Sequence, residues 1–163
     1  MKNLISILVG VLLFCNIIAV CEEQLYISEV MASNDVTLKD AFGKYSDWIE
    51  IYNPSDVAVS LKGVCLSDDK NEPLKYTFPE NAVLEAGEYT IVFASGLSKD
   101  IIIDEYHANF KLKAIGEAIY LSKDGQILDS VLFYDQKNDV SWQRLEDDTY
   151  SYCEQPTPTI GIE

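Results

Sequence analysis

The chain is poor in the side chains that most enzymes and metal sites use. It has a single histidine, His107, in 163 residues, with no His-x-x-x-His pair and no cysteine pair beside it to indicate zinc. His107 could act as a general base, but no Gly-x-Ser-x-Gly elbow or other evident nucleophile accompanies it. Carboxylate pairs are too numerous among the 27 acidic residues to indicate glycosidase chemistry. We therefore expect a protein that is not an enzyme and needs no cofactor.

Basic residues are also scarce. Twelve Lys and Arg stand against 27 Asp and Glu, which gives a net charge of −15. Such a chain repels phosphate backbones, so nucleic acid is excluded as a general partner. The acidity favours cationic partners or divalent ions, although the ordinary solubility of a surface is the simpler explanation.

Long apolar runs are missing except at the start. After Lys2, residues 4–20 are mostly apolar, and Glu22 and Glu23 end the run. This pattern predicts a secretory signal over residues 1–21, so that the domain occupies residues 24–163 outside the cytoplasm. A retained signal anchor is the alternative, since the run reaches the low end of the ~17–25 residues a spanning helix needs. We expect no other contact with a membrane.

Cys21 leaves two further outcomes open at this boundary. The preceding Ile18-Ala19-Val20 resembles a lipobox, which would make Cys21 a lipidated N-terminus, but Val20 stands where a small residue is usual. Alternatively, cleavage follows Cys21, with Ala19 and Cys21 as the small residues of the site.

Only two cysteines remain beyond the signal, Cys65 and Cys153. In an exported protein they could form a disulfide, which would stabilise by ~4–5 kcal/mol through loop closure. Two free, partly buried thiols are the alternative. Spacing along the chain does not decide between them.

Long helical periodicity, internal repeats and interdomain linkers are absent as well. From Gln24 onward, short β-prone runs alternate with turns, and Asp124-Gly125 between two apolar runs predicts a hairpin. The last predicted strand covers residues 141–145. Seven to nine short strands at this spacing indicate one all-β, two-sheet sandwich.

What is present most distinctively is Asp47-Trp-Ile-Glu-Ile-Tyr-Asn-Pro54, a strand that stops at a turn. This segment resembles the lamin tail domain family in its secreted bacterial form, an immunoglobulin-like β-sandwich. Similar motifs of this family recur along residues 25–160. The residues that carry it are Asn34, Asp47, Trp48, Glu50, Asn53, Pro54, Gly63, Gly87, Asp124 and Gly125. Gln143 and Thr159 depart from the family pattern, which has Gly at both places. The resemblance implies structural roles for these residues and brings no catalytic residue.

Two polar clusters are candidates for chemistry. Asp47, Glu50 and Asn53 surround Trp48, and we interpret them as structural, bonding nearby backbone. Asp68 and Asp69 could offer oxygens to Ca²⁺. That segment lacks the EF-hand spacing and contains Lys70, so a solvated turn is the expected reading.

Exposed aromatic rings would offer a binding surface. The candidates are Trp48, Tyr52, Trp142, Tyr150 and Tyr152, although large aromatics usually fill the core. We expect a non-catalytic scaffold or interaction module of lamin tail type that binds a protein partner at the cell surface. The alternatives are a carbohydrate-binding module that uses these rings on a surface glycan and, more remotely, an envelope hydrolase.

Overall fold

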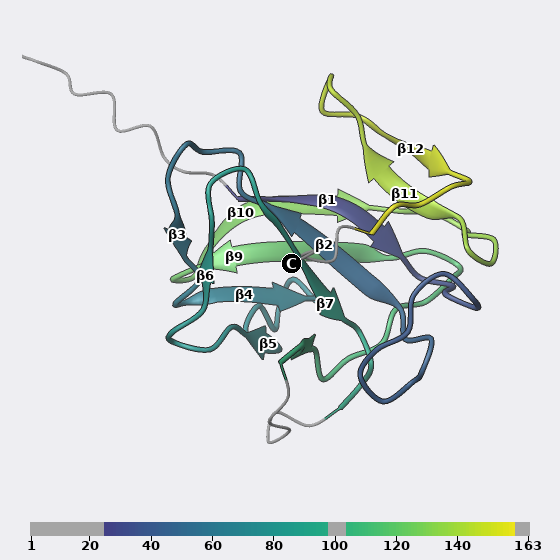
Figure 1. Ribbon diagram of the computed structural model, residues 1–163, viewed down its shortest axis with the longest axis horizontal. Coiled ribbons are helices and arrows are strands. Elements are labelled where there is room, and N and C mark those ends of the chain that lie inside the picture. Colours follow the sequence, from purple (N-terminus) through teal and green to yellow (C-terminus); the bar gives the residue numbers. More distant parts are fainter. Residues whose placement is uncertain (1–24, 98–103, 159–163) are drawn as a thin grey trace, which may run out of the picture.

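The computed structural model describes residues 25–97 and 104–158, which form strands and no helix (Figure 1). One sheet has six strands, in the order β12 (Tyr150–Cys153), β11 (Ser141–Arg144), β1 (Tyr26–Met31), β2 (Trp48–Tyr52), β7 (Tyr89–Phe93) and β8 (Tyr106–His107). A second sheet has four, in the order β10 (Gln126–Leu132), β9 (Ala118–Lys123), β4 (Val64–Ser67) and β5 (Tyr76–Thr77). A short ribbon pairs β3 (Val59–Ser60) with β6 (Val83–Leu84). The predicted signal and Thr159 lie outside the described residues.

The two larger sheets pack face to face around one core. Alternate residues of the strands point into it, as the period of two in a half-buried strand requires. Ile49 and Ile51 of β2 and Leu66 of β4 are fully buried there, as are Ile119 and Leu121 of β9. All strand pairs are antiparallel except β7 with β8. The all-β sandwich predicted from the sequence is thus confirmed.

The predicted hairpin at Asp124-Gly125 is present between β9 and β10. Both residues have positive φ, 50° and 84°, as a two-residue primed turn requires. Gly63 approaches this turn so closely that a Cβ at its position would lie 2.6 Å from Asp124 Oδ1. Gly63 and Asp124, two residues of the family motifs that are far apart in the sequence, are therefore in close contact in the structure.

A β-bulge in β1 positions the site described below. The pairing of β1 with β2 slips between Ile27 and Glu29, so that Ile27 stands opposite Ile51 while Glu29 stands opposite Glu50. Because of the extra residue, Ser28, Glu29 leaves the core face and joins Tyr26 on the outer face. Without the bulge, the alternation would have turned Glu29 into the core.

The structure contains three strands that the sequence did not predict, namely β6, β8 and β12. Two of them are only two residues long, and β12 pairs with β11 alone. The disulfide between Cys65 and Cys153 is not formed, because both thiols are free. Cys65 lies on β4 in the four-stranded sheet, and Cys153 lies on the edge strand of the other sheet. Of the two alternatives, the structure has the free thiols.

Candidate functional site

The outer face of the six-stranded sheet carries three cross-strand rows of side chains from β1, β2 and β7. The strand register aligns an apolar row, an acidic row and a tyrosine row, which consist of Met31, Trp48 and Phe93, of Glu29, Glu50 and Ile91, and of Tyr26, Tyr52 and Tyr89. Neighbouring rows lie two residues apart along β2 and β7. The face therefore changes character from one end to the other.

At the apolar end, the chain covers its own sheet. Leu38, from the segment between β1 and β2, packs on Met31, Trp48 and Phe93 in a second buried cluster. Trp48 is fully buried, so of the two alternatives for this aromatic candidate the structure has the ring that fills the core. Its indole Nε1 has no hydrogen-bond partner among the described residues, so Trp48 contributes to this cluster by packing alone.

Asn34 holds the covering segment in place. Its Nδ2 donates to Leu38 O and Ser46 O, both at 2.7 Å, and its Oδ1 accepts from the backbone of Thr37 and Leu38. Asp47 Oδ1 accepts a hydrogen bond from Asn34 N. Burial raises the pKa of Asp47, although the bond from Asn34 opposes that effect. The structural role predicted for these two residues is what the geometry supports.

Asp139, which the sequence did not single out, fastens the same segment from the other side. One oxygen accepts from the amides of Asp35, Val36 and Thr37 and from the Thr37 hydroxyl. Burial alone would raise the pKa of Asp139, but these bonds hold it below its ordinary value. The loop before β11 and the segment after β1 are thus locked together.

His107 has partners that the sequence did not reveal. Its Nδ1 lies 2.9 Å from Ser95 Oγ, and its Nε2 lies 3.3 Å from Glu105 Oε2. The ring stacks on Phe93 at 5.3 Å and meets Phe42 edge-on at 5.6 Å. Although the order serine, histidine, carboxylate suggests a triad, the imidazole side chain is only 4% exposed between two aromatic rings. We interpret it as a packing residue that joins β8 to the covering segment.

The acidic row is buried as well, but it is polar. Glu29 and Glu50 are 2% and 3% exposed. The Ser28 hydroxyl donates to Glu50 Oε1 at 2.7 Å, and the Ser141 hydroxyl donates to Glu29 Oε1. Burial, with a smaller contribution from the charge of Glu50, raises the pKa of Glu29 to about 7, while the bond from Ser141 opposes the shift. One of these two carboxyl groups therefore titrates near neutral pH.

The tyrosine row forms a wall beside the two glutamates. The ring centroids of Tyr26 and Tyr52 are 5.3 Å apart, and those of Tyr52 and Tyr89 are 4.3 Å apart. Burial and the neighbouring tyrosines raise the pKa of Tyr26 and Tyr89 above 10, so both stay neutral at ordinary pH. Tyr52, a candidate from the sequence, contacts both of its neighbours in this row.

Arg144 ties the β11–β12 hairpin to this wall. Its guanidinium lies 4.3 Å from the centre of the Tyr26 ring and donates to Asp129 Oδ2 of β10 at 2.9 Å. Asp129 Oδ2 also accepts from Ile27 N at the bulge. The Tyr150 hydroxyl donates to Ile27 O, and burial raises the pKa of Tyr150 to about 12. The bulge, both sheets and the hairpin meet at this point.

A cavity of about 320 Å³ opens between the acidic row, the tyrosine wall and the hairpin. Its lining consists of Tyr26, Ser28, Glu29, Glu50, Tyr89, Gln143, Arg144, Leu145, Glu146 and Thr157. Gln143 stands opposite Glu29 in the strand register and extends the acidic row onto β11. The arrangement offers carboxylates and a hydroxyl at its base and aromatic rings at its side.

Asn53, the residue before Pro54, organises the turn after β2. Its Nδ2 donates to the carbonyls of Val57, Leu84 and Glu85, and Ser55 donates to its Oδ1. Gly87 N donates to Asn53 O, and Gly87 has φ 69°. Asn53 is fully buried, so it serves the backbone of these loops.

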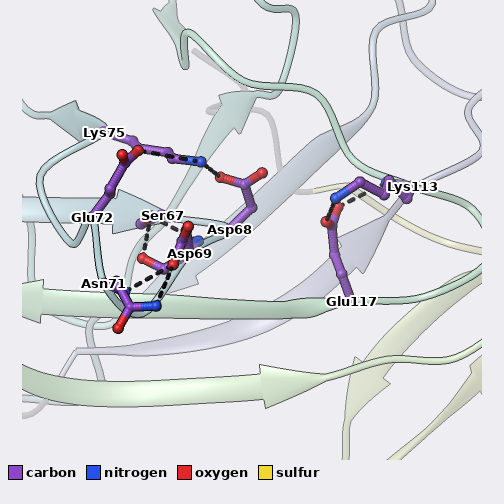
Figure 2. Close-up of polar contacts among 8 residues, drawn as sticks. All are labelled: Ser67, Asp68, Asp69, Asn71, Glu72, Lys75, Lys113 and Glu117. Atoms are coloured by element: carbon purple, nitrogen blue, oxygen red, sulfur yellow. Dashed lines mark hydrogen bonds and ion pairs between the residues drawn. The ribbon is translucent and has the colours of Figure 1, made fainter.

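The acidic turn proposed for calcium satisfies its own charges, as Figure 2 shows. Lys75 Nζ lies 2.8 Å from Asp68 Oδ1, and Asp69 Oδ1 accepts from Asn71 N at the same distance. Ser67 Oγ accepts from Asp69 N. Among the described residues, no group of three or more His, Cys, Asp or Glu is placed to hold a metal ion. Asp68 and Asp69 therefore belong to a hydrogen-bonded turn.

A second aromatic group lies on the hairpin. The ring of Trp142 meets Tyr152 at 4.7 Å and Tyr134 at 6.0 Å, both edge-on. Tyr152 and Tyr134 are 47% and 57% exposed, whereas Trp142 is partly buried against the core. Of the aromatic candidates from the sequence, Tyr152 is the one that offers an exposed ring.

Sequence reasoning missed Ser28, Glu29, Ser141 and Arg144. A signal for the first two was present, because two polar residues between Ile27 and Val30 break the alternation of β1 and so indicate a bulge. Nothing local indicated that Ser141 and Arg144 join this site, since the partners that bring them there, Glu29 and Asp129, lie more than ten residues away.

Comparison with known proteins bears on these findings. The model of the Lamin Tail Domain family matches residues 22–135, from before β1 to just after β10. A search of curated proteins finds no match. In the parts of the chain that the structure describes, no helix has the length and apolar character to cross a membrane. The matched range covers more than half of the chain and the fold agrees with it, so this chain belongs to the lamin tail domain family, a family of non-enzymatic, immunoglobulin-like domains.

Proposed function

We propose that this chain is a non-catalytic interaction module of lamin tail type that binds a protein partner outside the cytoplasmic membrane. The observation that carries this proposal is that polar side chains of the family motifs bond the backbone of loops. Asn34 and Asn53 each bond several backbone groups of neighbouring loops, and Asp139, which lies beyond the matched residues, does the same. Side chains that hydrogen-bond the loop backbone keep the surface of the domain rigid, and a scaffold requires a rigid surface.

The surface itself supports this function. A net charge of −15 favours a partner with a basic face, and attraction of this kind weakens as salt rises. The exposed rings of Tyr134 and Tyr152 and the partly buried ring of Trp142 form an aromatic group on one side of the hairpin. Aromatic side chains are enriched at the centres of protein interfaces. We therefore place the contact on this aromatic group.

Site-specific crosslinking tests the proposal in the cells that make the protein. A photoreactive phenylalanine analogue replaces Tyr152 in one variant and Leu74 in another. Leu74 is 60% exposed, in the turn before β5, and serves as the matched control. The Tyr152 position should yield one discrete crosslinked protein with a basic surface, and the Leu74 position should yield none. The same protein captured equally from both positions, or from neither, contradicts the proposal.

The compartment rests on residues 1–21 and has its own test. Mass spectrometry of the mature N-terminus separates the three outcomes. A chain that begins at Glu22 is secreted, a diacylglyceryl group on Cys21 makes a lipoprotein, and an intact Met1 indicates an anchor. A chain found in the cytoplasm overturns the extracytoplasmic proposal.

A carbohydrate-binding module is the second candidate, and the exposed ring of Tyr152 beside Trp142 favours it. Planar rings of this kind can stack on sugars. Tyr152→Ala should abolish glycan-array binding if this candidate holds, while Tyr45→Ala, a change at a 39% exposed ring elsewhere, should preserve it. Absence of glycan binding by the unaltered protein removes the candidate.

A further inference from the structure

The cavity at the acidic end contains hydrogen-bonding capacity that the protein does not use. Glu29 is 2% exposed and lines the cavity. Among the described residues, the Ser141 hydroxyl is the one group that donates to its carboxylate, and it does so at Oε1. Its second oxygen accepts no hydrogen bond from these residues and is not sealed from solvent, so it can accept one from a ligand in the cavity.

Three carboxyl groups and one guanidinium line the cavity. Glu29 and Glu50 stand directly opposite each other on neighbouring strands, where like charges destabilise a sheet. Glu146 adds a third carboxyl group to the lining. Arg144 is the cation of the lining, but its guanidinium already pairs with Asp129 at 2.9 Å and with Asp148 at 3.1 Å. The cavity therefore favours a positive charge from outside the described chain.

The shape of the cavity selects the kind of cation. Its volume of about 320 Å³ is roughly ten times the share of one water molecule in the liquid, far more than a bare metal ion fills. Calcium prefers six to eight oxygen ligands, and the described residues hold no group of three or more His, Cys, Asp or Glu placed to bind a metal ion. The rings of Tyr26 and Tyr89 line one side, where a cation with an alkyl chain gains contact with aromatic surface.

We propose that this cavity binds a primary alkylammonium group, which donates hydrogen bonds to Glu29 and Glu50 while its alkyl chain lies against Tyr26 and Tyr89. A lysine side chain of a partner and a free alkylamine share this chemistry. Gln143, Arg144, Leu145, Glu146 and Thr157 all lie beyond the residues that match the family, so part of the cavity wall is outside the matched domain. Amine binding at this cavity goes beyond the proposed binding of a protein partner and does not depend on it.

Titration with n-butylammonium chloride tests the site on the purified full-length protein. The amine should bind saturably to the unaltered protein. Glu29→Gln and Glu50→Gln should each weaken binding by roughly tenfold or more, which is about 1.4 kcal/mol per factor of ten. Glu80→Gln removes the same charge at a side chain that is 86% exposed, and it should leave binding unchanged. Lack of saturable binding, or an equal loss in all three variants, overturns the proposal.

Two further probes examine the chemistry of the ligand. Tetramethylammonium chloride carries the same charge but has no N–H donor, so it should bind clearly more weakly than n-butylammonium. Calcium chloride should not displace the bound amine. Equal binding by tetramethylammonium, or displacement by calcium, contradicts a site built for a primary ammonium group.

The pH dependence keeps the test valid even if a variant fails to fold. The groups that face Glu29 in the cavity are Glu50, Arg144, Tyr26, Tyr89 and Glu146. The tyrosines stay neutral because their pKa values are raised above 10, and the alkylamine stays charged because its pKa is about 10.4. Since the pKa of Glu29 is about 7, the ionised fraction of this carboxyl group rises from roughly a tenth at pH 6 to roughly nine-tenths at pH 8. Affinity should rise by up to about tenfold over this range, and a flat profile contradicts the assignment.

The source of the amine is decided by comparing 1,5-diaminopentane with Nα-acetyl-lysine N-methylamide. Tighter binding of the lysine derivative assigns the cavity to a partner's side chain, and tighter binding of the diamine assigns it to free amines. Binding of neither overturns the proposal. Crosslinking at Tyr152 tests the proposed function separately, because Tyr152 is outside the lining of the cavity.

Discussion

The two ends of the outer face differ although they share the same three strands. At one end Met31, Trp48 and Phe93 are sealed beneath Leu38, and the chain itself supplies the cover. At the other end Glu29 and Glu50 lie at the base of an open cavity. The chain covers the first end with its own residues, whereas the second end opens onto a cavity lined by carboxyl groups and aromatic rings.

The difference comes from one extra residue and from the choice of cover. The bulge at Ser28 turns Glu29 outward, whereas the regular pairing beyond it places Met31 opposite Trp48. The apolar end is covered by a segment whose backbone is held by Asn34, while the acidic end is flanked by the β11–β12 hairpin. In Figure 1 this hairpin extends away from the body of the sandwich. A sheet can thus build a core at one end and a binding cavity at the other without changing its strands.

Removing the centre of the apolar end should have the largest effect. Trp48→Ala deletes a fully buried indole, and we expect the free energy of unfolding to fall by about 3–5 kcal/mol in urea denaturation. Trp48→Phe should cost less, because it keeps an aromatic ring in the cluster. A loss below about 1 kcal/mol for Trp48→Ala would show that this end is not a core.

Neutralising Glu29 at the acidic end should raise the free energy of unfolding rather than lower it. The pKa of Glu29 is about 7 in the folded protein against an ordinary 4.5, so the folded state holds this proton more tightly. Protonated Glu29 therefore contributes to the free energy of unfolding. This contribution is fully present below about pH 4.5 and is lost as the pH rises through about 7.

Glu29→Gln should therefore stabilise the protein above pH 7, by at most roughly 3 kcal/mol, and should have little effect at pH 4. Urea denaturation at both pH values measures the difference. Glu80→Gln, at an exposed side chain, provides the control for loss of one charge. Destabilisation by Glu29→Gln at pH 8 contradicts this account of the acidic row.

Loosening the cover should have an intermediate effect. Asn34→Ala removes the side chain that bonds Thr37, Leu38 and Ser46, and we expect a loss of about 1–3 kcal/mol. Amide exchange in the segment between β1 and β2 should accelerate, while alkylamine binding at the other end stays as it was. Equal disturbance of both ends would show that they are not independent.

The smallest effect on stability is expected at the exposed ring of the hairpin. Tyr152→Ala should change the free energy of unfolding by no more than about 0.5 kcal/mol, because the ring is half exposed and its hydroxyl bonds only one carbonyl, Asp135 O. It should nevertheless abolish crosslinking to the proposed protein partner. A large loss of stability would instead make Tyr152 part of the fold.

The sequence predicted most of the architecture because its signals are local. The alternation in Ile49 and Ile51 and the Asp124-Gly125 turn indicate strands and a hairpin without reference to the rest of the chain. β6, β8 and β12 were missed because they are short or exposed, and each is defined by its partner strand rather than by its own pattern.

The site was harder to predict, since its parts come together only through tertiary contacts. The sequence left open whether the ring of Trp48 is exposed or fills the core, and only the structure shows that Leu38 covers it. Glu50 was a candidate because it belongs to a family motif. Glu29 joins the site only because the bulge turns it to the outer face, where Ser141, 112 residues away, donates a hydrogen bond to it. A disulfide between Cys65 and Cys153 remained open for the same reason, and the strands hold these cysteines in different sheets.

Carboxyl-carbon NMR of Glu29 across pH 4 to 9 tests the contrast between the two ends most directly. The account predicts a titration midpoint near 7 in the free protein, and a lower midpoint when n-butylammonium chloride is present, because a bound cation favours the ionised carboxylate. A midpoint near the ordinary 4.5, or one near 7 that the amine does not move, would contradict it.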